Sequence, residues 1–237
     1  VEEVSEETGK KREELSKIAP IVSSEKAAKI LLKMWDKHYN RTADFLVIEG
    51  PKAGGHLGFS KEQLSDVAAI PFDEEVKKII ACKKEYEDKF GVKIPVVVGG
   101  GIFTKEDADH AFSLGADAIQ VASRFVTTYE CDADEKYKEA YLNAAPEDVQ
   151  IVQSPVGMPG RAIRNKFIMD LETSKKKITK CYNCLAKCNP KEVPYCITKA
   201  LIDAVKGDVD GGLVFCGANA GRQDRMMYVK DVVGELL

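Results

Sequence analysis

A histidine stands directly after two glycines in the stretch IEGPKAGGHLGF, residues 48–59. The apolar residues at its start indicate a strand that ends near Gly50. Gly54 and Gly55 have no side chains, so a ligand can approach the backbone closely there. His56 has an imidazole whose ordinary pKa of about 6.5 lets it give or take a proton near neutral pH. The pattern predicts a site where a ligand approaches the backbone with the His56 imidazole beside it, against the simpler interpretation of a structural histidine.

Two further segments place small residues after apolar runs, where backbone N–H groups can bind an anion. Gly99-Gly100-Gly101 follows the run IPVVV and precedes the helix-capping residues of the next segment. Such glycines let N–H groups converge on a phosphate, which the dipole of the following helix also favours. The run DAIQVAS then ends with Ala122 and Ser123, where a hydroxyl and free N–H groups suit the same phosphate. The alternative is that these glycines only make tight turns. No G-x-G-x-x-G pattern appears in residues 99–104, which disfavours a Rossmann nucleotide site.

Four of the seven cysteines fall in the stretch CYNCLAKCNPKEVPYC. Cys181, Cys184, Cys188 and Cys196 have the spacing C-x2-C-x3-C-x7-C, which predicts a metal site. Zinc sites usually offer two tight pairs, whereas three close cysteines and a more distant fourth suit an iron–sulfur cluster better. Iron–sulfur, zinc and free thiols all remain open interpretations.

Short apolar runs alternate with segments of helical periodicity in the first half of the chain. Strands are expected over residues 18–22, 44–50, 94–101 and 117–125. A helix is expected over 25–39, with Ala27, Ile30, Leu31 and Met34 as its apolar stripe. A second helix is expected after a capping box at Ser60 and Gln63 and ends near Gly91. A third is expected from the Thr104–Asp107 box to Leu114. This alternation predicts an α/β fold with a parallel sheet, in which ligands bind at the carboxyl ends of the strands.

The pattern changes after about residue 128. Helices are expected over 133–144, 194–207 and 226–237, and a Pro- and Gly-rich loop over 154–167. This loop carries Arg161 and Arg164, which either meet an anionic substrate or brace the loop against the sheet.

The composition describes an ordinary globular protein of 237 residues with a net charge of −3. Nothing in this balance of charges indicates a nucleic-acid partner, and no apolar run is long enough for a membrane span. The polar start, residues 1–17, resembles an amphipathic helix rather than a signal peptide, so a cytoplasmic location is expected. The other histidines, His38 and His110, lie in helical segments and are expected at the surface.

The motifs EGPKAGGHLG, IPVVVGGGI, GADAIQVASRF and SPVGMPGRAIRN, in this order, resemble those of the nitronate monooxygenases. They are similar also to the related flavin-dependent enoyl-acyl-carrier-protein reductase II. Both kinds of enzyme use FMN in a TIM (β/α)8 barrel. The resemblance covers residues 15–237 and implies that the four expected strands are about the fifth to eighth of such a barrel.

The resemblance also implies roles for the residues above. Gly54 and Gly55 would let the backbone pass close to the flavin, and His56 would be the catalytic residue over the isoalloxazine ring. Gly99, Gly100, Gly101, Gln120, Ala122 and Ser123 would hold the phosphate end of FMN. The family more commonly has Gly-Thr where this chain has Ala122-Ser123, and it does not require the four cysteines.

The expected organisation is a C-terminal half barrel, a covering domain and a returning segment. The half barrel spans residues 1–127, a smaller and mainly helical domain over the substrate spans 128–212, and residues 213–237 return to the barrel. The chain is therefore expected to be a fragment of a longer protein, since four strands with both edges open form a poor unit alone.

The expected activity is the oxidative denitrification of alkyl nitronates with oxygen. One alternative is an enoyl-acyl-carrier-protein reductase that consumes NAD(P)H. A second is a non-catalytic flavin or metal-cluster protein that senses redox state. A small-molecule substrate is expected in the first two cases, and the oligomeric state stays open.

Overall fold

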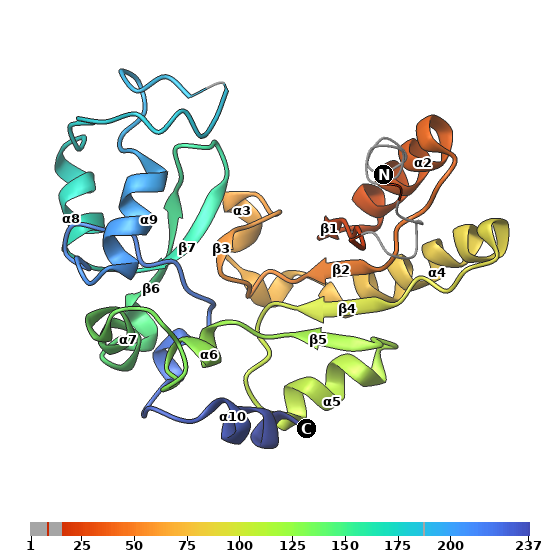
Figure 1. Ribbon diagram of the computed structural model, residues 1–237. Helices are drawn as coiled ribbons and strands as arrows, with labels where there is room; N and C mark the ends of the chain where they lie inside the picture. The colour runs from red at the N-terminus through yellow and green to blue at the C-terminus, as the bar shows by residue number, and fades with distance from the viewer. Residues whose placement is uncertain (1–8, 10–15, 187) are drawn as a thin grey trace.

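A four-stranded parallel sheet lies at the centre of the larger part of the molecule (Figure 1). The computed structural model describes residue 9 and residues 16–186 and 188–237, so most of the helix expected over 1–17 lies outside the described residues. The strand order is β1-β2-β4-β5, with every neighbouring pair parallel. The bounds are Ile21–Val22 for β1, Leu46–Glu49 for β2, Val96–Gly99 for β4 and Ala118–Gln120 for β5. The predicted α/β class with a parallel sheet is confirmed.

Three helices pack on this sheet, each with bounds set by local sequence signals. Helix α2 (Glu25–Tyr39) begins after Ser24, whose hydroxyl accepts the Ala27 N–H, and it ends at Asn40 in the left-handed conformation. Helix α4 (Phe72–Phe90) ends at Gly91 with φ 64°. Helix α5 (Lys105–Ser113) begins with the predicted Thr104–Asp107 capping box. These caps satisfy backbone groups that the helix itself leaves unpaired.

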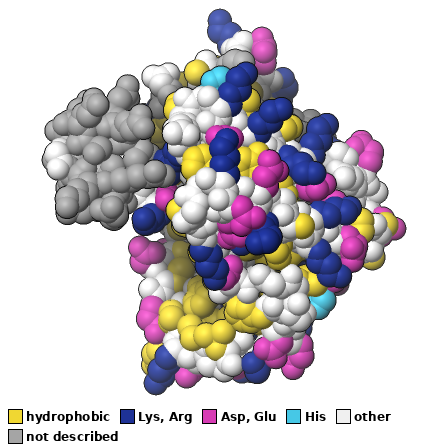
Figure 2. Space-filling view, turned by 90° about the vertical axis from the view of Figure 1, so that its right-hand side faces the viewer, with side chains coloured by type: hydrophobic (Ala, Val, Ile, Leu, Met, Phe, Trp, Pro, Cys, Tyr) yellow, Lys and Arg dark blue, Asp and Glu magenta, His cyan; other side chains and the backbone are white. Residues whose placement is uncertain are grey.

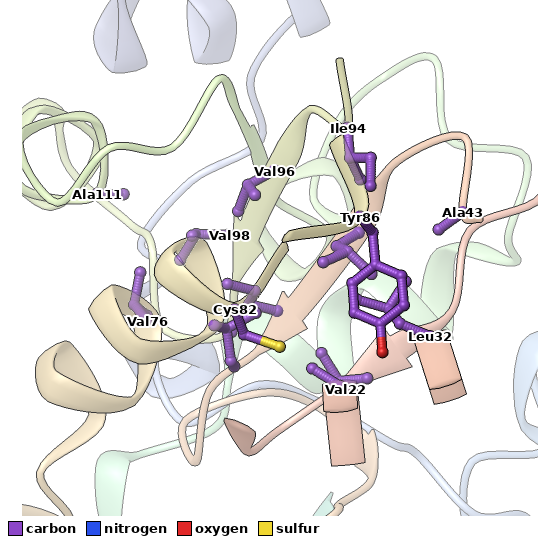
Figure 3. Packing of buried hydrophobic residues seen from close by; sticks show 14 residues of the cluster. Val22, Leu32, Ala43, Val76, Cys82, Tyr86, Ile94, Val96, Val98 and Ala111 are labelled. Atoms are coloured by element: carbon purple, nitrogen blue, oxygen red, sulfur yellow. The ribbon is translucent and has the colours of Figure 1, made fainter. Parts of the chain in front are cut away.

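The main core lies between the sheet and these helices (Figure 3). Alternate strand residues face the helices, because successive side chains of a strand point to opposite sides. The fully buried members include Leu32 of α2, Val76 and Ile79 of α4, and Leu46, Ile48 and Val96 of the strands. The apolar stripe expected for α2 is partly wrong. Ala28 and Leu32 are its buried residues, whereas Ile30 and Met34 are 52% and 45% exposed.

A second sheet of three strands lies beside the first and has the order β3-β7-β6. Its strands are β3 (Gly55–His56), β6 (Val149–Gln153) and β7 (Pro159–Ile163), and all pairs are antiparallel. The loop expected over 154–167 is therefore wrong, because only residues 154–158 form a turn between β6 and β7. Pro159 is tolerated as the first residue of its strand, and Gly160 fits because a Cβ there would lie 2.8 Å from the Phe215 ring.

Helices surround this second sheet. They are α7 (Glu135–Leu142), α8 (Lys166–Thr173) and α9 (Ile197–Val205), and α7 and α9 match predicted helices. Helix α8 replaces the end of the expected loop, where Asn165 caps it by accepting the Ile168 N–H at 3.1 Å. The region 128–212 thus combines helices with a β-hairpin, so the expectation of a mainly helical region is too narrow. The division at residues 127 and 212 stays a prediction.

Strand β5 is also shorter than expected. The strand predicted over 117–125 ends at Gln120, and Ser123–Val126 forms the short helix α6. The remaining elements are the short helix α3 (Lys61–Leu64), which the predicted Ser60–Gln63 box caps, and the terminal helix α10 (Val229–Leu236). Helix α10 lies against α5 and α6 (Figure 1). The 3-10 turns are Val67–Ala69, Pro146–Asp148 and Ala220–Arg222.

Charges of both signs are mixed over the face shown in Figure 2, without a large area of one sign. His38 and His110 are exposed, as predicted. No helix in the described part of the chain has the length and apolar character needed to cross a membrane.

Candidate functional site

A cavity of about 210 Å³ opens at the carboxyl ends of β2, β4 and β5. Most of the residues predicted from the sequence for a ligand site line it: Gly54, Gly55, Gly100, Gly101, Gln120, Ala122 and Ser123. Gly99 lies just outside as the last residue of β4, where it pairs with Glu49 and Gln120. The structure therefore brings the tips of neighbouring strands together around one space.

Gly100 and Gly101 form the floor of this cavity in a conformation that needs glycine. Their φ angles are 96° and 105°, which disfavour any residue with a Cβ. A Cβ on Gly100 would lie 2.8 Å from the backbone of Gly50, and one on Gly101 would lie 2.8 Å from the Lys52 side chain. At these two positions the cavity is therefore lined by backbone rather than by a side chain.

A segment near the C-terminus closes the cavity and was not predicted as part of the site. It runs from Phe215 to Asn219, and each of its residues lines the cavity. The Gly217 N–H donates to the Ser123 Oγ at 2.9 Å, the Ala218 N–H donates to the Lys52 carbonyl at 3.0 Å, and the Asn219 side chain donates to the Gly101 carbonyl at 2.7 Å. These bonds join the segment to all three strand tips. The sequence signal was present, since GGLVFCGAN repeats the pattern of an apolar run followed by glycine.

Ser123 is placed so that its hydroxyl oxygen accepts from the closing segment while its hydrogen stays available. A hydroxyl accepts and donates at the same time, so Ser123 can still donate to a phosphate in the cavity. Ala122 also lines the cavity, with its methyl group.

Glu49 and Lys52 are two charged residues of the cavity that the sequence analysis missed. Glu49 is the last residue of β2, and its burial raises the pKa of its carboxyl above the ordinary value. Their positions at the end of an apolar strand, on either side of Gly50-Pro51, were the available signal.

His56 lies beside the cavity rather than among the residues that line it. It belongs to β3, opposite Gly160 of β7, and its ring packs edge-on against Phe215 with 5.1 Å between ring centroids. Its Nε2 lies 2.7 Å from the Oγ of Ser154, a residue that is 2% exposed. Burial lowers the pKa of His56 below 6.5, so its imidazole is neutral at pH 7. Phe215 therefore links the histidine to the cavity wall.

Arg161 and Arg164 have different surroundings. Arg161 is 4% exposed, lies opposite Gly55 and donates from Nη1 to the Ala53 carbonyl, so it braces the turn before β3. Burial lowers its pKa from the ordinary value. Arg164 is exposed and lies 3.6 Å from Glu172. Neither arginine lines the cavity.

Cys216 is a neutral thiol in the cavity wall. It is 2% exposed, and burial raises its pKa to about 12, although the neighbouring Arg161 opposes this shift. A Cβ on Gly54 would lie 2.7 Å from the Cys216 carbonyl carbon, which explains the glycine at position 54.

The four clustered cysteines border a second cavity of about 430 Å³, away from the first. Cys181, Cys184, Cys188 and Cys196 all line it, together with Tyr182 and Tyr195. Among the described residues, however, no three His, Cys, Asp or Glu side chains are placed so that they could hold a metal ion. The structure gathers the four thiols around one space without forming a ligand set, so the predicted metal site finds no support.

An α/β fold with a glycine-lined cavity at the ends of its parallel strands is typical of ligand-binding α/β proteins. Comparison with known proteins identifies the family. Residues 4–237 match the family model described as nitronate monooxygenase. The chain belongs to the nitronate monooxygenase family, whose members are flavin-dependent oxidoreductases.

Individual relatives agree with this assignment. A protein of Staphylococcus aureus (strain Newman) described as "Probable nitronate monooxygenase" is 28% identical over 131 residues, which are 54% of this chain and 34% of that protein. The matched segment thus spans about a third of the relative's length.

Solved structures show the same fold. FabK from Thermotoga maritima has a TM-score of 0.66 and 26% identity, over 93% of this chain and 60% of that one. Nitroalkane oxidase from Streptomyces ansochromogenes has a TM-score of 0.63 and 21% identity, over 92% and 55%.

Proposed function

We propose that this chain supplies the phosphate-binding and substrate-facing parts of an FMN-dependent nitronate monooxygenase, which oxidises alkyl nitronates with oxygen. The observation that carries the proposal is the cavity at three strand ends, with His56 beside it. Its floor fits a phosphate, because Gly100 and Gly101 leave a cradle that a Cβ at either position would disrupt. Peptide N–H groups in such a cradle favour an anion.

Residues of the chain take separate roles in this proposal. The 99–101 segment and the Ser123 hydroxyl hold the phosphate end of FMN, and Gln120 and Ala122 border it. Gly54 and Gly55 let the backbone approach the flavin ring. When bound, the flavin accepts electrons from the substrate and passes them to oxygen. His56 deprotonates a nitroalkane or orients an anionic nitronate.

The four parallel strands correspond in this proposal to four consecutive strands of a (β/α)8 barrel, about the fifth to eighth. The region 128–212 covers the substrate, and residues 213–237 return to the barrel. The other strands would come from outside these 237 residues, consistent with the 60% of the FabK chain that this chain covers.

A second candidate is an NAD(P)H-dependent enoyl-acyl-carrier-protein reductase, favoured by the similarity to FabK. In that reaction the same imidazole would help to protonate the substrate. A non-catalytic flavin protein is a third candidate, and it requires that no turnover depend on His56.

Turnover by the complete flavin-loaded protein distinguishes these candidates. We expect oxygen consumption with an alkyl nitronate, without added nicotinamide. The variant His56→Ala should keep FMN and lose about tenfold or more in kcat/KM for the nitronate, as for loss of a hydrogen bond that orients the substrate. His38→Ala is the matched control, because His38 is exposed and lies on α2. NAD(P)H consumption with an enoyl thioester, without nitronate oxidation, would favour the reductase.

The cysteine prediction is tested separately, because the structure does not support it. Anaerobically purified complete protein should contain iron and acid-labile sulfide if an iron–sulfur cluster is present, or stoichiometric zinc if the site is a zinc site. Neither metal is expected if the four residues are free thiols.

A further inference from the structure

The hydrogen bond between His56 and Ser154 indicates which ring nitrogen of His56 carries the proton. The Nε2 and Oγ atoms are 2.7 Å apart, and either atom can be the donor in a bond of this kind. The direction follows from the other bonds that Ser154 makes, because a buried hydroxyl hydrogen without an acceptor costs free energy.

Ser154 is the first residue of the turn between β6 and β7. Its Oγ accepts the Val156 N–H at 3.4 Å, while its own backbone bonds with Met158 and Gly157 close the turn. Its side chain is buried, and among the described residues the acceptor within reach of the hydroxyl hydrogen is Nε2 of His56. The Ser154 Oγ then accepts the Val156 N–H and donates its own hydrogen to Nε2 of His56, so both hydrogens have an acceptor.

The groups around His56 favour the neutral form of its imidazole. The lowered pKa of His56 has desolvation as its cause. On the paired strand β7 the charged residue is Arg161, which donates to the Ala53 carbonyl, and the 154–158 turn has no charged residue. The Phe215 ring covers another side, and Cys216 beside it is a neutral thiol. The neutral imidazole carries a single N–H, so an Nε2 that accepts leaves the proton on Nδ1.

We propose that Ser154 is a positioning residue that fixes His56 as a neutral imidazole with its proton on Nδ1. The inference rests on the proposed function and deepens it. Nδ1 then acts as a hydrogen-bond donor toward the substrate and has no lone pair with which to remove a proton. Such a donor suits an anionic nitronate oxygen, so the substrate enters already ionised and the neutral nitroalkane is used poorly.

Nuclear magnetic resonance of ¹⁵N-histidine-labelled complete protein reads the tautomer directly. The chain has three histidines, so His38→Gln and His110→Gln assign the signals of this part of the protein by loss. At pH 7 to 8 we expect His56 to show a protonated Nδ1 and an unprotonated Nε2. The opposite pattern in the folded protein would overturn the inference.

Removal of the Ser154 hydroxyl should remove the preference of His56 for the Nδ1–H tautomer. In Ser154→Ala we expect a shift toward the Nε2–H form and a fall in kcat/KM for a nitronate of up to about tenfold, the kinetic equivalent of one hydrogen bond. Ser154→Thr keeps the hydroxyl and should restore the tautomer. Ser60→Ala, which removes an exposed hydroxyl from a helix cap, should change neither signal.

The pH profile separates a donor from a base. Because the imidazolium also donates from Nδ1, kcat/KM for a nitronate should not fall as the pH drops through the lowered pKa of His56. A neutral nitroalkane still carries the α-proton that a base would remove, so nitroalkane turnover that falls as the pH drops through that pKa would indicate that His56 is a base and would contradict the proposal. The tautomer signal does not depend on turnover, so it stays readable if the protein shows no nitronate activity. That outcome would count against the proposed function alone.

Discussion

Arg161 shows how one buried side chain fixes the backbone beside the cavity. Its guanidinium donates to the Ala53 carbonyl, directly before the two glycines and His56. A hydrogen bond from a charged group contributes more than a neutral one, and the long apolar stem adds packing.

Replacement of this residue should destabilise the protein. We expect Arg161→Ala to lower the free energy of unfolding by about 2 to 3 kcal/mol, because it leaves a buried carbonyl unpaired. Arg164→Ala is the matched control, and loss of its exposed pair with Glu172 should cost about 1 kcal/mol or less. Urea denaturation measures both values. Equal losses would show that Arg161 has no special role.

The cysteines should differ sharply in their reactivity. Cys181 and Cys184 are exposed, whereas Cys82 and Cys216 are buried. The thiolate is the reactive form, and burial raises the pKa of Cys216 to about 12. We therefore expect an alkylating reagent at pH 8, with a chelator present, to modify Cys181 and Cys184 first.

Peptide mapping by mass spectrometry follows each site. Cys82 and Cys216 should react only after unfolding in urea. Modification of Cys216 as fast as Cys181 in the folded protein would mean that the wall behind Gly54 opens readily.

Among the elements, the loops after β2 and β4 approach each other closely at Gly50 and Gly100. Gly100→Ala should destabilise the protein by more than the roughly 1 to 2 kcal/mol of a left-handed conformation, because its Cβ meets the Gly50 backbone. It should also weaken FMN binding, since the phosphate cradle must shift.

Gly91 provides the control for this prediction. Its φ is 64°, yet a Cβ there would have no atom within 4 Å. Gly91→Ala should therefore cost only the conformational term and leave FMN binding unchanged. Thermal unfolding and a flavin titration measure the two effects. Similar FMN affinities in both variants would argue against a phosphate cradle at Gly100.

Local signals predicted the elements of the larger sheet well. The Ser24, Thr104 and Gly91 caps act within a few residues, so the ends of α2, α4 and α5 follow from sequence alone. The β6-β7 hairpin did not follow, because Pro159 and Gly160 are unusual strand residues whose fit depends on the distant Phe215. The stripe of α2 was misplaced because which apolar residues become buried depends on how α2 packs against α4.

The site was predictable to a similar extent. Glycines at strand ends marked the cavity, since their conformation is a local property. The Ser154 partner of His56 lies 98 residues away and required the fold. The cysteine spacing indicated a metal, but spacing alone does not determine how the four thiols are arranged in space.

At the scale of the whole molecule, a ligand that joins several strand tips should stabilise the fold. FMN at one hundred times its dissociation constant is expected to add about 2.7 kcal/mol to the stability of the complete protein. Thermal unfolding with increasing FMN should show this as a rising midpoint. Riboflavin, which lacks the phosphate, is the matched control and should give a smaller rise. Equal effects of the two compounds would contradict a phosphate site in this chain.

The closing segment from Phe215 to Asn219 has a consequence for biosynthesis. Its bonds to Lys52, Gly101 and Ser123 join parts of the chain that a ribosome makes at very different times. A nascent polypeptide that already contains the glycine loops still lacks one wall until residues 215–219 have been synthesised. Products that terminate before residue 215 should therefore emerge colourless, even with every predicted glycine and His56 in place.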